Sequence, residues 1–301
     1  MMRSMYSAVT GLRNHQIAMD VIGNNIANVN TIGYKRSKTS FATMLSQNLS
    51  GAAAPDNLNS PPTFGGINPI QVGLGMSISS IDRIMNQGAA QNTGKATDMM
   101  VQDDGFFVVR LGSDIFYTRT GNFDFDRDGN LVDPSTGALV QGYANSTLQG
   151  TSPAPVAPSW GTATGSMNIK LGMDHPDLAG FTLSGFTIDK KGVITGIYSD
   201  GTQSITEQLY MISLANFSNP GGLMAMGNNF YAPSNNSGAA SVGKPGENGL
   251  GTIIPGALEM SNVELAQEFT DMIVTQRGFQ ANSRVITVSD SLLQELIDLK
   301  R

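Results

Sequence analysis

The chain contains no cysteine, so disulfide bonds, thiolate metal sites and cysteine nucleophiles are excluded. It has only two histidines, His15 and His175, and neither is close in sequence to a nucleophile or to a group of metal ligands. No other stretch has the spacing that catalytic residues require. The sequence therefore predicts a protein that is not an enzyme and that needs no cofactor and no metal ion.

Charge is also scarce, at 14% charged residues against about 25% in ordinary soluble domains. The net charge is -6 and no long basic run occurs, whereas a nucleic-acid-binding face needs clustered lysine and arginine. Nucleic acid is therefore excluded as a partner. Much of the folded surface must consist of uncharged polar residues and glycine, and such a surface suits packing against neighbouring molecules.

Long apolar runs are missing as well. Polar residues interrupt the N-terminal stretch MMRSMYSAVTGLRNHQ every two or three positions, so it predicts no cleaved signal peptide, and no segment predicts direct membrane insertion. The 301 residues are nevertheless 40% hydrophobic, which is enough to build real cores in one to three domains.

The two ends of the chain share a heptad pattern that the middle lacks, and this pattern predicts two helices that pair as a coiled coil. The first apolar seam comprises Met5, Leu12, Met19 and Ile26 near the N-terminus and Leu265, Met272, Phe279, Ile286 and Leu293 near the C-terminus. The second seam comprises Val9, Gln16, Gly23 and Asn30, then Phe269, Gln276, Ser283, Asp290 and Ile297. Its middle, Gln276, Ser283 and Asp290, is polar. Buried polar residues at heptad positions often fix the helix register. Pairing within one chain and packing among several copies both fit the pattern.

The boundaries of these helices follow from capping signals. Ser261 and Glu264 have the spacing of a capping box, which predicts a C-terminal helix from about 260 to 299. The N-terminal helix should end near Asn28 to Asn30, with Gly33 in a left-handed conformation and Lys35 complementing the helix dipole.

Four asparagines, Asn24, Asn25, Asn28 and Asn30, gather at this helix end. An asparagine side chain both donates and accepts hydrogen bonds. Simple capping of the helix is one role that these four residues can have.

The middle of the chain reads as antiparallel β structure, with hairpin turns at Gly112-Ser113, Lys191-Gly192 and Asp200-Gly201. Three low-complexity stretches, 48–70, 144–167 and 232–251, are predicted to be loops or linkers.

The segment DFDRDGN is the one stretch that resembles a metal-binding loop. It places Asp124, Asp126 and Asp128 at the spacing of a calcium loop, but the twelfth position is Ser135 instead of glutamate. A tight hairpin with Asp128-Gly129 at its turn is the better interpretation.

Four stretches then match a family. SAVTGL…MDVIGNNIANVNTIGYKRSKTSF, TGKATDMMVQDDGFFVV, YTRTGNFDFDRDGNLVDPSTGALVQGY and GALEMSNVELAQEFTDMIVTQRGFQANSRVITVSDSLLQELIDL together resemble the bacterial flagellar rod and hook proteins, over roughly two thirds of the chain. FTIDKKGVITGIYSDG and LANFSNPGGLMAMGNNFYAPSNNSG resemble the hook proteins most, particularly the short ones of Gram-positive-type bacteria. The distal rod proteins are the close alternative.

This resemblance implies a division into domains. Residues 1–34 plus 257–301 would form an inner coiled-coil domain, 35–72 a linker, and 73–143 plus 186–256 a β domain. Residues 144–185 would be a short insertion, a reduced form of the outer domain that larger hook proteins carry. The implied fold is mixed but mainly β, with antiparallel β structure inserted between the two terminal helices.

The resemblance also implies a function. The chain would be a structural subunit that polymerises into a hollow, flexible helical tube, transmits motor torque to the filament and lets exported subunits pass. In such a tube, the polar heptad residues Gln276, Ser283 and Asp290 would either face the channel or fix the helix register. The residues at the end of the N-terminal helix would cap the helix and contact neighbouring subunits, or only cap it: Asn24, Asn25, Asn28, Asn30 and Gly33. Its partners would be further copies of itself, the distal rod protein, the hook cap, the hook–filament junction proteins and the flagellar type III export apparatus. It would act outside the cell, in the hook or basal body, after export without a cleaved signal peptide. A secreted adhesin with a coiled-coil stalk is the competing class, and an enzyme is a remote one.

Overall fold

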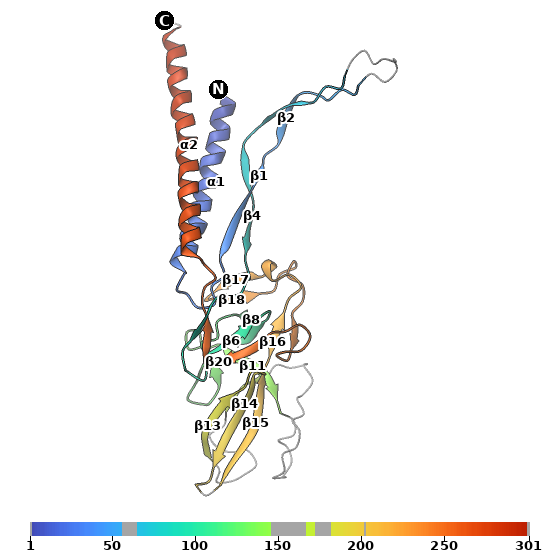
Figure 1. The fold of residues 1–301 in the computed structure, drawn as a ribbon, viewed down its shortest axis with the longest axis vertical. Coiled ribbons are helices and arrows are strands. Elements are labelled where there is room, and N and C mark those ends of the chain that lie inside the picture. Colours follow the sequence, from blue (N-terminus) through green and yellow to red (C-terminus); the bar gives the residue numbers. More distant parts are fainter. Residues whose placement is uncertain (1, 56–64, 146–166, 172–181, 202, 300–301) are drawn as a thin grey trace. The chain divides into compact units, whose positions relative to one another are not determined.

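The computed structural model describes residues 2–55, 65–145, 167–171, 182–201 and 203–299 (Figure 1). Helix α1 (Met2–Ala27) stands at the N-terminus and helix α2 (Leu265–Asp298) at the C-terminus, with strands between them. Every strand pair described is antiparallel, so the predicted mainly β fold class with helices at both ends is confirmed. The predicted insertion at 144–185 lies largely outside the described residues.

The first of two compact units comprises Met1–Ala27, Ser37–Ile84 and Val263–Arg301. Its two helices run antiparallel. Its strands form two successive two-stranded ribbons, which we call together the ribbon: β1 (Ser37–Thr43) with β4 (Met76–Arg83), and β2 (Ser46–Ser50) with β3 (Ile70–Gly73).

The ribbon occupies much of the segment 35–72 that the sequence led us to expect as a linker. Low-complexity polar residues dominate its first arm, but alternate backbone groups of the two arms pair across it, from Ser37 opposite Arg83 to Ser50 opposite Ile70. Because backbone hydrogen bonding needs no particular side chain, polar composition alone did not reveal these strands. The compact unit thus groups residues 37–84 with the helices.

The second unit comprises Asn28–Arg36 and Met85–Asn262. Most of it is a 13-stranded sheet whose main path is β13-β14-β15-β11-β7-β8-β18-β17. The strands on this path are β7 (Phe106–Leu111), β8 (Asp114–Thr118), β11 (Leu139–Ala144), β13 (Thr182–Ile188), β14 (Val193–Ser199), β15 (Ser204–Ile212), β17 (Met224–Gly227) and β18 (Phe230–Ala232). The shorter strands of the sheet are β9 (Asp124–Phe125), β10 (Leu131–Val132), β12 (Met167–Asn168), β16 (Leu214–Asn216) and β19 (Ser241–Gly243).

Two further strand pairs complete this unit. Each joins a strand that precedes β7 in the sequence to a strand that follows β19. β6 (Met99–Gln102) pairs with β20 (Thr252–Pro255), and β5 (Ala90–Asn92) pairs with β21 (Ala257–Glu259). A short 3-10 helix, η2 (Pro220–Gly222), precedes β17.

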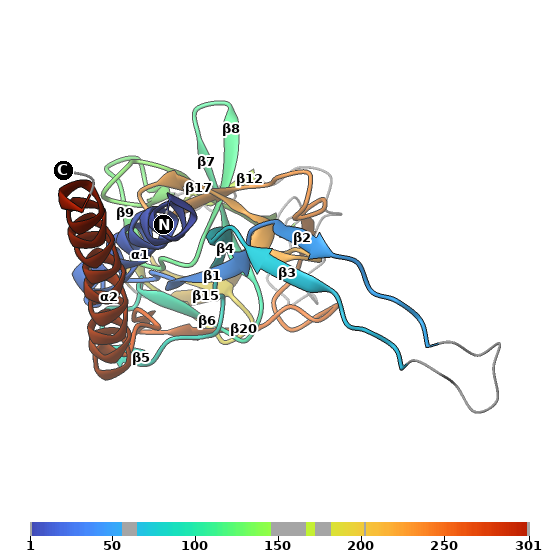
Figure 2. The same ribbon diagram turned by 90° about the horizontal axis from the view of Figure 1, so that it is seen from above.

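The core lies on both faces of the central strand β7. Phe107 and Val109 belong to the larger apolar cluster, whereas Phe106 and Val108 belong to a second one with Tyr117 and other residues. Successive side chains of a strand point to opposite faces, so the apolar run FFVV predicts a strand that is covered on both sides. The hairpin of β7 and β8 extends out of this unit (Figure 2).

The predicted turns are confirmed. Gly112, Gly129, Gly192 and Gly201 all have positive φ, at 65°, 80°, 69° and 86°, and they join β7 to β8, β9 to β10, β13 to β14 and β14 to β15. Positive φ costs glycine little because it has no Cβ.

The predicted start of the C-terminal helix is wrong. α2 begins at Leu265, and Glu264 stands at the N-cap with an extended backbone and no capping hydrogen bond from its side chain. The backbone N–H groups of Met260 and Asn262 donate instead to Ala89 and Tyr34, as a continuation of β21. This pairing keeps the residues of the expected capping box extended.

Candidate assembly site

The two helices approach each other through small residues. A Cβ added to Gly11 of α1 would lie 2.6 Å from Nδ2 of Asn282 of α2, and one added to Gly278 would lie 2.8 Å from Nε2 of His15. Farther along, Asn25 donates to Glu268 over 3.1 Å. The two residue numbers of each of these three pairs sum to 293, which fixes an antiparallel register.

Small residues explain the close approach, because the distance between packed helices depends on the side chains at the contact. The buried positions on α1 are Ala8, Gly11, Asn14, Ala18, Ile22 and Asn25, and those on α2 are Glu268, Thr275 and Ser289. The three buried positions on α2 follow a heptad spacing, but each lies one residue before a position of the second seam that the sequence predicted. Hydrophobic periodicity gives no signal for a seam of Thr, Ser, Asn and Gly.

The apolar residues of the predicted seams lie at the border of this contact or outside it. Met5, Leu12, Met19, Ile26, Met272, Phe279, Ile286 and Leu293 are half-buried, whereas Val9, Leu265, Phe269 and Ile297 are exposed. Gln276, Ser283 and Asp290 are exposed too. A single chain therefore leaves large apolar side chains of its helix pair uncovered, with Phe269 50% exposed and Val274 65% exposed.

The end of α2 adds to this uncovered surface. The register places Met2, the first residue of α1, opposite position 291. α2 continues to Asp298, so its last two turns have no residue of α1 beside them. They carry Leu292, Leu296 and Ile297, all exposed. Solvent-exposed leucines on consecutive turns of one helix mark a surface that packs against another molecule.

The asparagines at the end of α1 differ in their surroundings. Asn25 is 1% exposed, and its amide donates to the carbonyl of Ser37 (2.8 Å) and to Glu268 while its Oδ1 accepts from the Ser37 N–H (3.0 Å). Asn28 accepts a hydrogen bond from the hydroxyl of Thr31. Asn24 and Asn30 are exposed. Asn25 thus joins α1, α2 and the first residue of the ribbon.

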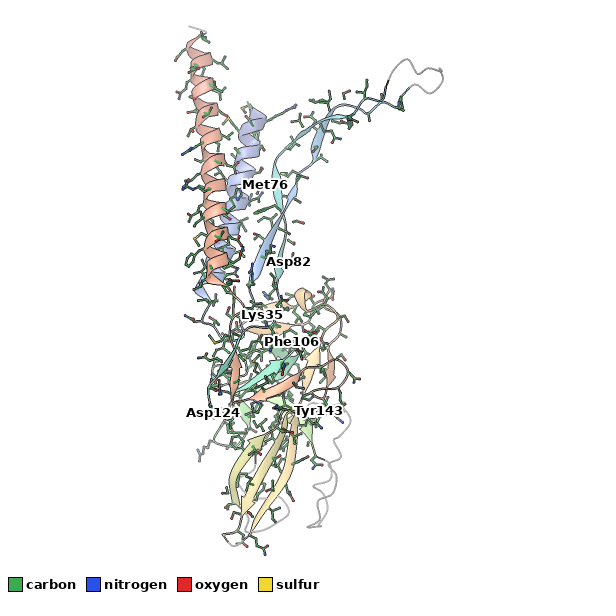
Figure 3. The ribbon with its side chains drawn as sticks, in the orientation of Figure 1. Lys35, Met76, Asp82, Phe106, Asp124 and Tyr143 are labelled. Atoms are coloured by element: carbon green, nitrogen blue, oxygen red, sulfur yellow. The ribbon has the colours of Figure 1, made fainter. Side chains whose placement is uncertain are left out.

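The ribbon packs against α1. Asn14 donates to the carbonyl of Met76 over 2.6 Å, and the ring of His15 meets the ring of Phe41 edge-on at 5.7 Å; Figure 3 labels Met76 on β4. Gly75 has φ +122°, and a Cβ there would collide with the hydroxyl of Thr10. No residue with a side chain fits at this close approach.

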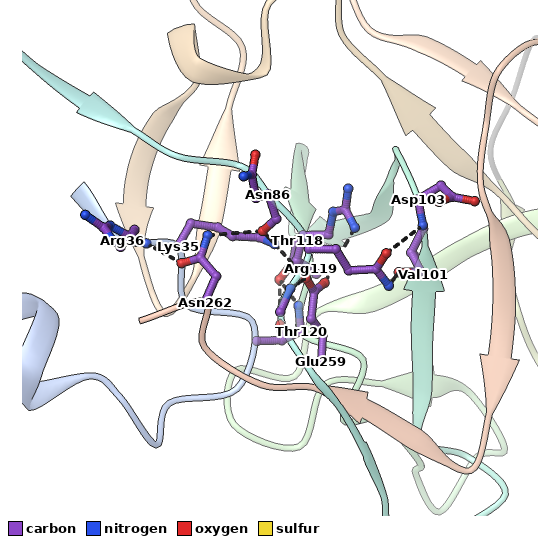
Figure 4. Close-up of polar contacts among 12 residues, drawn as sticks. Lys35, Arg36, Asn86, Val101, Asp103, Thr118, Arg119, Thr120, Glu259 and Asn262 are labelled. Atoms are coloured by element: carbon purple, nitrogen blue, oxygen red, sulfur yellow. Dashed lines mark hydrogen bonds and ion pairs between the residues drawn. The ribbon is translucent and has the colours of Figure 1, made fainter. Parts of the chain in front are cut away.

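The second unit contains a buried charged cluster, which we call the Glu259 cluster: Lys35, Gly88, Arg119 and Glu259 (Figure 4). Glu259 is 0% exposed. Its Oε1 accepts from Nζ of Lys35 (2.6 Å) and from the Gly88 N–H (2.8 Å), and its Oε2 lies 3.5 Å from the Arg119 guanidinium. Nζ of Lys35 also donates to the carbonyl of Asn86.

Two cations therefore share one carboxylate in a dry environment. Burial lowers the pKa of Lys35 below its ordinary value, against the opposing effect of the Glu259 carboxylate, and burial lowers the pKa of Arg119 in the same way. The Arg119 guanidinium lies 5.1 Å from the centre of the Phe106 ring, which offers it a cation–π contact. Without Glu259, Lys35 and Arg119 would lose the carboxylate that they share, and Arg119 would keep only the weaker attraction of Asp104. Removal of one partner from a buried ion pair is strongly unfavourable.

Backbone contacts around the Glu259 cluster hold two distant segments together. The Gly33 N–H donates to the carbonyl of Glu259 (2.8 Å), and Gly33 has the predicted left-handed conformation, with φ +67°. Asn262 accepts from the Arg36 N–H (2.8 Å) and donates to the carbonyl of Asn86. Residues 33–36, which follow α1 by a short loop, are thereby tied to residues 259–262, which precede α2.

The predicted role of Lys35 is wrong, because α1 has no basic residue in its last turn and Lys35 is buried against Glu259. Sequence reasoning missed the cluster because its ion pair joins residues 224 positions apart. The one available signal was a single charge inside the apolar strand GALEM, at Glu259.

The acidic turn supports the hairpin interpretation. The Asp126 carboxylate accepts from the N–H groups of Asp128 and Asn130 and from the Asn130 side chain, all within 2.9 Å. Among the described residues, no group of histidine, aspartate or glutamate side chains has the geometry of a metal site. Neither of the two described helices is long and apolar enough to cross a membrane.

Three family models match the chain. Residues 5–35 match "Flagella basal body rod protein", residues 100–196 match "Flagellar hook protein FlgE/F/G D1 domain", and residues 254–299 match "Flagellar basal body rod FlgEFG protein C-terminal". The first and third contain the two helices, and the second contains the central strands of the large sheet.

Curated relatives cover the whole chain. The flagellar basal-body rod protein FlgG of Bacillus subtilis is 41% identical over 302 aligned positions, covering 100% of both chains. The flagellar hook protein FlgE of Borreliella burgdorferi is 35% identical over 449 aligned positions, and that of Treponema pallidum is 32% identical over 471, again with full coverage of both chains.

Proposed function

Because this chain belongs to the family of flagellar rod and hook proteins, we propose that many copies of it polymerise into a hollow helical tube that transmits torque from the flagellar motor. The observation that carries this proposal is the uncovered apolar surface of the helix pair, including Phe269, Val274 and Leu296. A second helix pair is the natural cover for such a surface, since burial of each large apolar side chain contributes about 1.5 to 3 kcal/mol.

The tube as proposed has an inner and an outer layer. The helix pair, predicted as 1–34 plus 257–301, forms the inner layer, and the β domain, predicted as 73–143 plus 186–256, forms the outer one. Gln276, Ser283 and Asp290 are exposed on one stripe of α2 and would face the channel, where polar side chains let unfolded cargo slide past. Asn24 and Asn30 are exposed, and in the proposed tube they lie at the end of α1 where neighbouring subunits meet.

The hook is the first candidate for the place of this subunit. In favour of it are relatives named as hook proteins that align over the full chain, and the hook-like stretches 186–201 and 214–238, which contain β14 and β16 to β18. As a hook subunit, the chain would form a flexible joint between rod and filament, in contact with the distal rod protein, the hook cap and the hook–filament junction proteins. It would reach that place outside the cell through the type III export apparatus.

The distal rod is the second candidate. It is favoured by the rod protein of Bacillus subtilis, which aligns over 302 positions, close to the 301 residues of this chain, whereas the hook proteins need 449 or more. A rod subunit would form a stiff drive shaft instead of a flexible joint.

Electron microscopy of basal bodies from a strain that lacks this gene distinguishes the two candidates. Complete rods without hooks would support the hook subunit, and truncated rods would support the rod subunit. Normal flagella would contradict both. Reintroduction of the gene should restore the missing structure.

A further inference from the structure

The faces that pair α1 with α2 are identical in every copy of the chain. In the proposed tube, on which this inference rests, the helices of many copies lie at high local concentration. Each α1 can then pair with α2 of its own chain or with α2 of a neighbouring copy. The small polar contacts of the seam, such as those of Gly11 and Gly278, do not distinguish the two, because they are the same in either pairing.

We infer that the Glu259 cluster favours pairing of α1 with α2 of the same chain, because it ties the two terminal segments together before the helices pair. It joins Lys35 to Glu259 at 2.6 Å, and the neighbouring contacts of Gly33 and Asn262 hold the backbones in place. All of these groups belong to the second unit, so they need no contact from either helix. The cluster therefore persists in a chain whose helices have not yet paired.

Loop closure gives the size of the effect. The register places Ala18 opposite Thr275, and these residues are 257 positions apart in sequence. In the folded β body, the pairing of Ala90 with Glu259 already shortens this separation to the 72 residues from Ala18 to Ala90 and the 16 from Glu259 to Thr275. With the cluster closed, only the 17 residues from Ala18 to Lys35 and the same 16 form the loop. Since closure probability falls with about the 3/2 power of loop length, the cluster raises the local concentration of the correct partner up to about 4-fold.

The buried charges give the cluster a specific geometry, which suits this role. A buried ion pair is a poor source of net stability, but its geometry is specific, because a displaced partner leaves a buried charge unpaired. Glu259 also has Arg119 and the Gly88 N–H as partners in the β body, so the carboxylate is already in place when Lys35 arrives. Lys35 is thus the separable, terminal part of the cluster.

The test uses the absence of cysteine from the native chain, which makes any introduced thiol unique. One chain carries Ala18→Cys and a second carries Thr275→Cys, both at buried positions of the seam. The two are mixed, assembled into fibres and oxidised. A disulfide between them forms only where α1 of one copy pairs with α2 of another, and it appears as a dimer on a denaturing gel.

The release variant is Lys35→Met with Asn262→Ala, which leaves Glu259 paired with Arg119. Its matched control is Lys38→Met with Asn235→Ala, which changes the same residue types at exposed positions. We expect fibres of the native and control chains to give monomers on the gel, and fibres of the release variant to give dimers. Dimers from native fibres, or the same pattern in release and control fibres, would overturn the inference while leaving the axial role intact.

Absence of fibres from the native chain would contradict the proposed function instead. The inference is then tested in dilute solution with a chain that carries both cysteines. Its intrachain disulfide should form up to about 4-fold more slowly in the release variant than in the control, and equal rates would refute the role of the cluster. Thermal unfolding followed by near-UV circular dichroism checks that the β body has folded. If the double substitution unfolds it, Asn262→Ala alone, which changes no charge, provides the same comparison.

Discussion

Glu259 stands alone between two buried cations, Lys35 and Arg119, and its own side chain is completely buried. Replacement of a buried charged residue of this kind lowers stability strongly, because its partner groups lose a charge that water cannot replace. Glu259 is the residue for which the structure makes such a prediction most directly.

Replacement of Glu259 by glutamine keeps the shape of the side chain and removes its charge. Because Lys35 and Arg119 would then lose the carboxylate that they share, we expect a loss of about 3 to 5 kcal/mol in the free energy of unfolding, measured by urea denaturation. Glu247→Gln, at an exposed position, is the control and should change it by less than about 0.5 kcal/mol. Equal stability of the two variants would show that the Glu259 cluster contributes nothing to the fold.

Asp126 makes the acidic turn sensitive to pH. Hydrogen bonds from the Asn130 side chain and from backbone N–H groups hold its pKa below the ordinary value of 3.8. Between that lowered pKa and 3.8 the unfolded chain binds more protons than the folded one, so the contribution of the carboxylate is full above 3.8 and is lost as the pH falls through the lowered pKa. Asp126→Asn should therefore be less stable than the native protein at neutral pH, with a difference that shrinks in acid.

Acid titration followed by circular dichroism measures this difference. Asp114→Asn, at the exposed β7–β8 turn, removes the same charge without touching the hydrogen bonds of Asn130. A difference between native and Asp126→Asn protein that stays constant from pH 7 to pH 2 would contradict the prediction.

At the scale of elements, the seam between α1 and α2 differs most from a simple apolar coiled coil. The sequence predicted both helices from their heptads, and it predicted the half-buried positions such as Met272 and Phe279. It did not predict the inner line at Glu268, Thr275 and Ser289, because residues of that kind have no hydrophobic periodicity. Nor did it predict the ribbon, whose strands depend on backbone pairing.

Gly11 tests how close the helices must come. Gly11→Leu would force Asn282 away and separate the helices, and overpacking of this kind costs about 1 to 3 kcal/mol. Gly23 lies on the same helix with nothing within 4 Å of an added Cβ, so Gly23→Ala should instead stabilise α1 by up to about 1 kcal/mol. Thermal melting of fibres, followed by light scattering, compares the two. A melting temperature that Gly11→Leu does not lower would mean that the seam is looser than described.

Asn25 tests the end of α1. Asn25→Ala would leave buried groups of Ser37 and Glu268 without the amide, at a cost of about 1 to 3 kcal/mol. We expect it to lower fibre formation while the amount of secreted protein stays unchanged. Asn30→Ala, at an exposed position of the same loop, shows how much of the effect belongs to contacts between subunits. Wild-type fibre yield from Asn25→Ala would rule out a role for this residue in assembly.

At the scale of the whole molecule, long-range contacts decide what the sequence could not show. The two terminal helices and the central hairpins follow from local patterns, and the turns follow from single glycines such as Gly129. The Glu259 cluster joins residues that are hundreds of positions apart, so only a three-dimensional structure brings them together. The family resemblance supplied the assembly, which no single chain displays.

The stripe of Gln276, Ser283 and Asp290 provides the test of the tube itself. If this stripe lines the channel, leucine at all three positions should slow the export of later flagellar subunits, because unfolded apolar segments would adhere to the wall. The amount of later subunits in the culture medium measures the effect, with the secretion of the variant itself as the control. A change only in fibre stability would place the stripe between subunits instead.

The ribbon begins at Ser37 and returns to the opposite residue, Arg83, so its two ends lie side by side. Adding or removing residues in equal numbers on both arms changes its reach by about 3.4 Å per pair, and the chain on either side keeps its path. A laboratory could therefore graft a tag or a longer arm into this segment with little disturbance to the remainder.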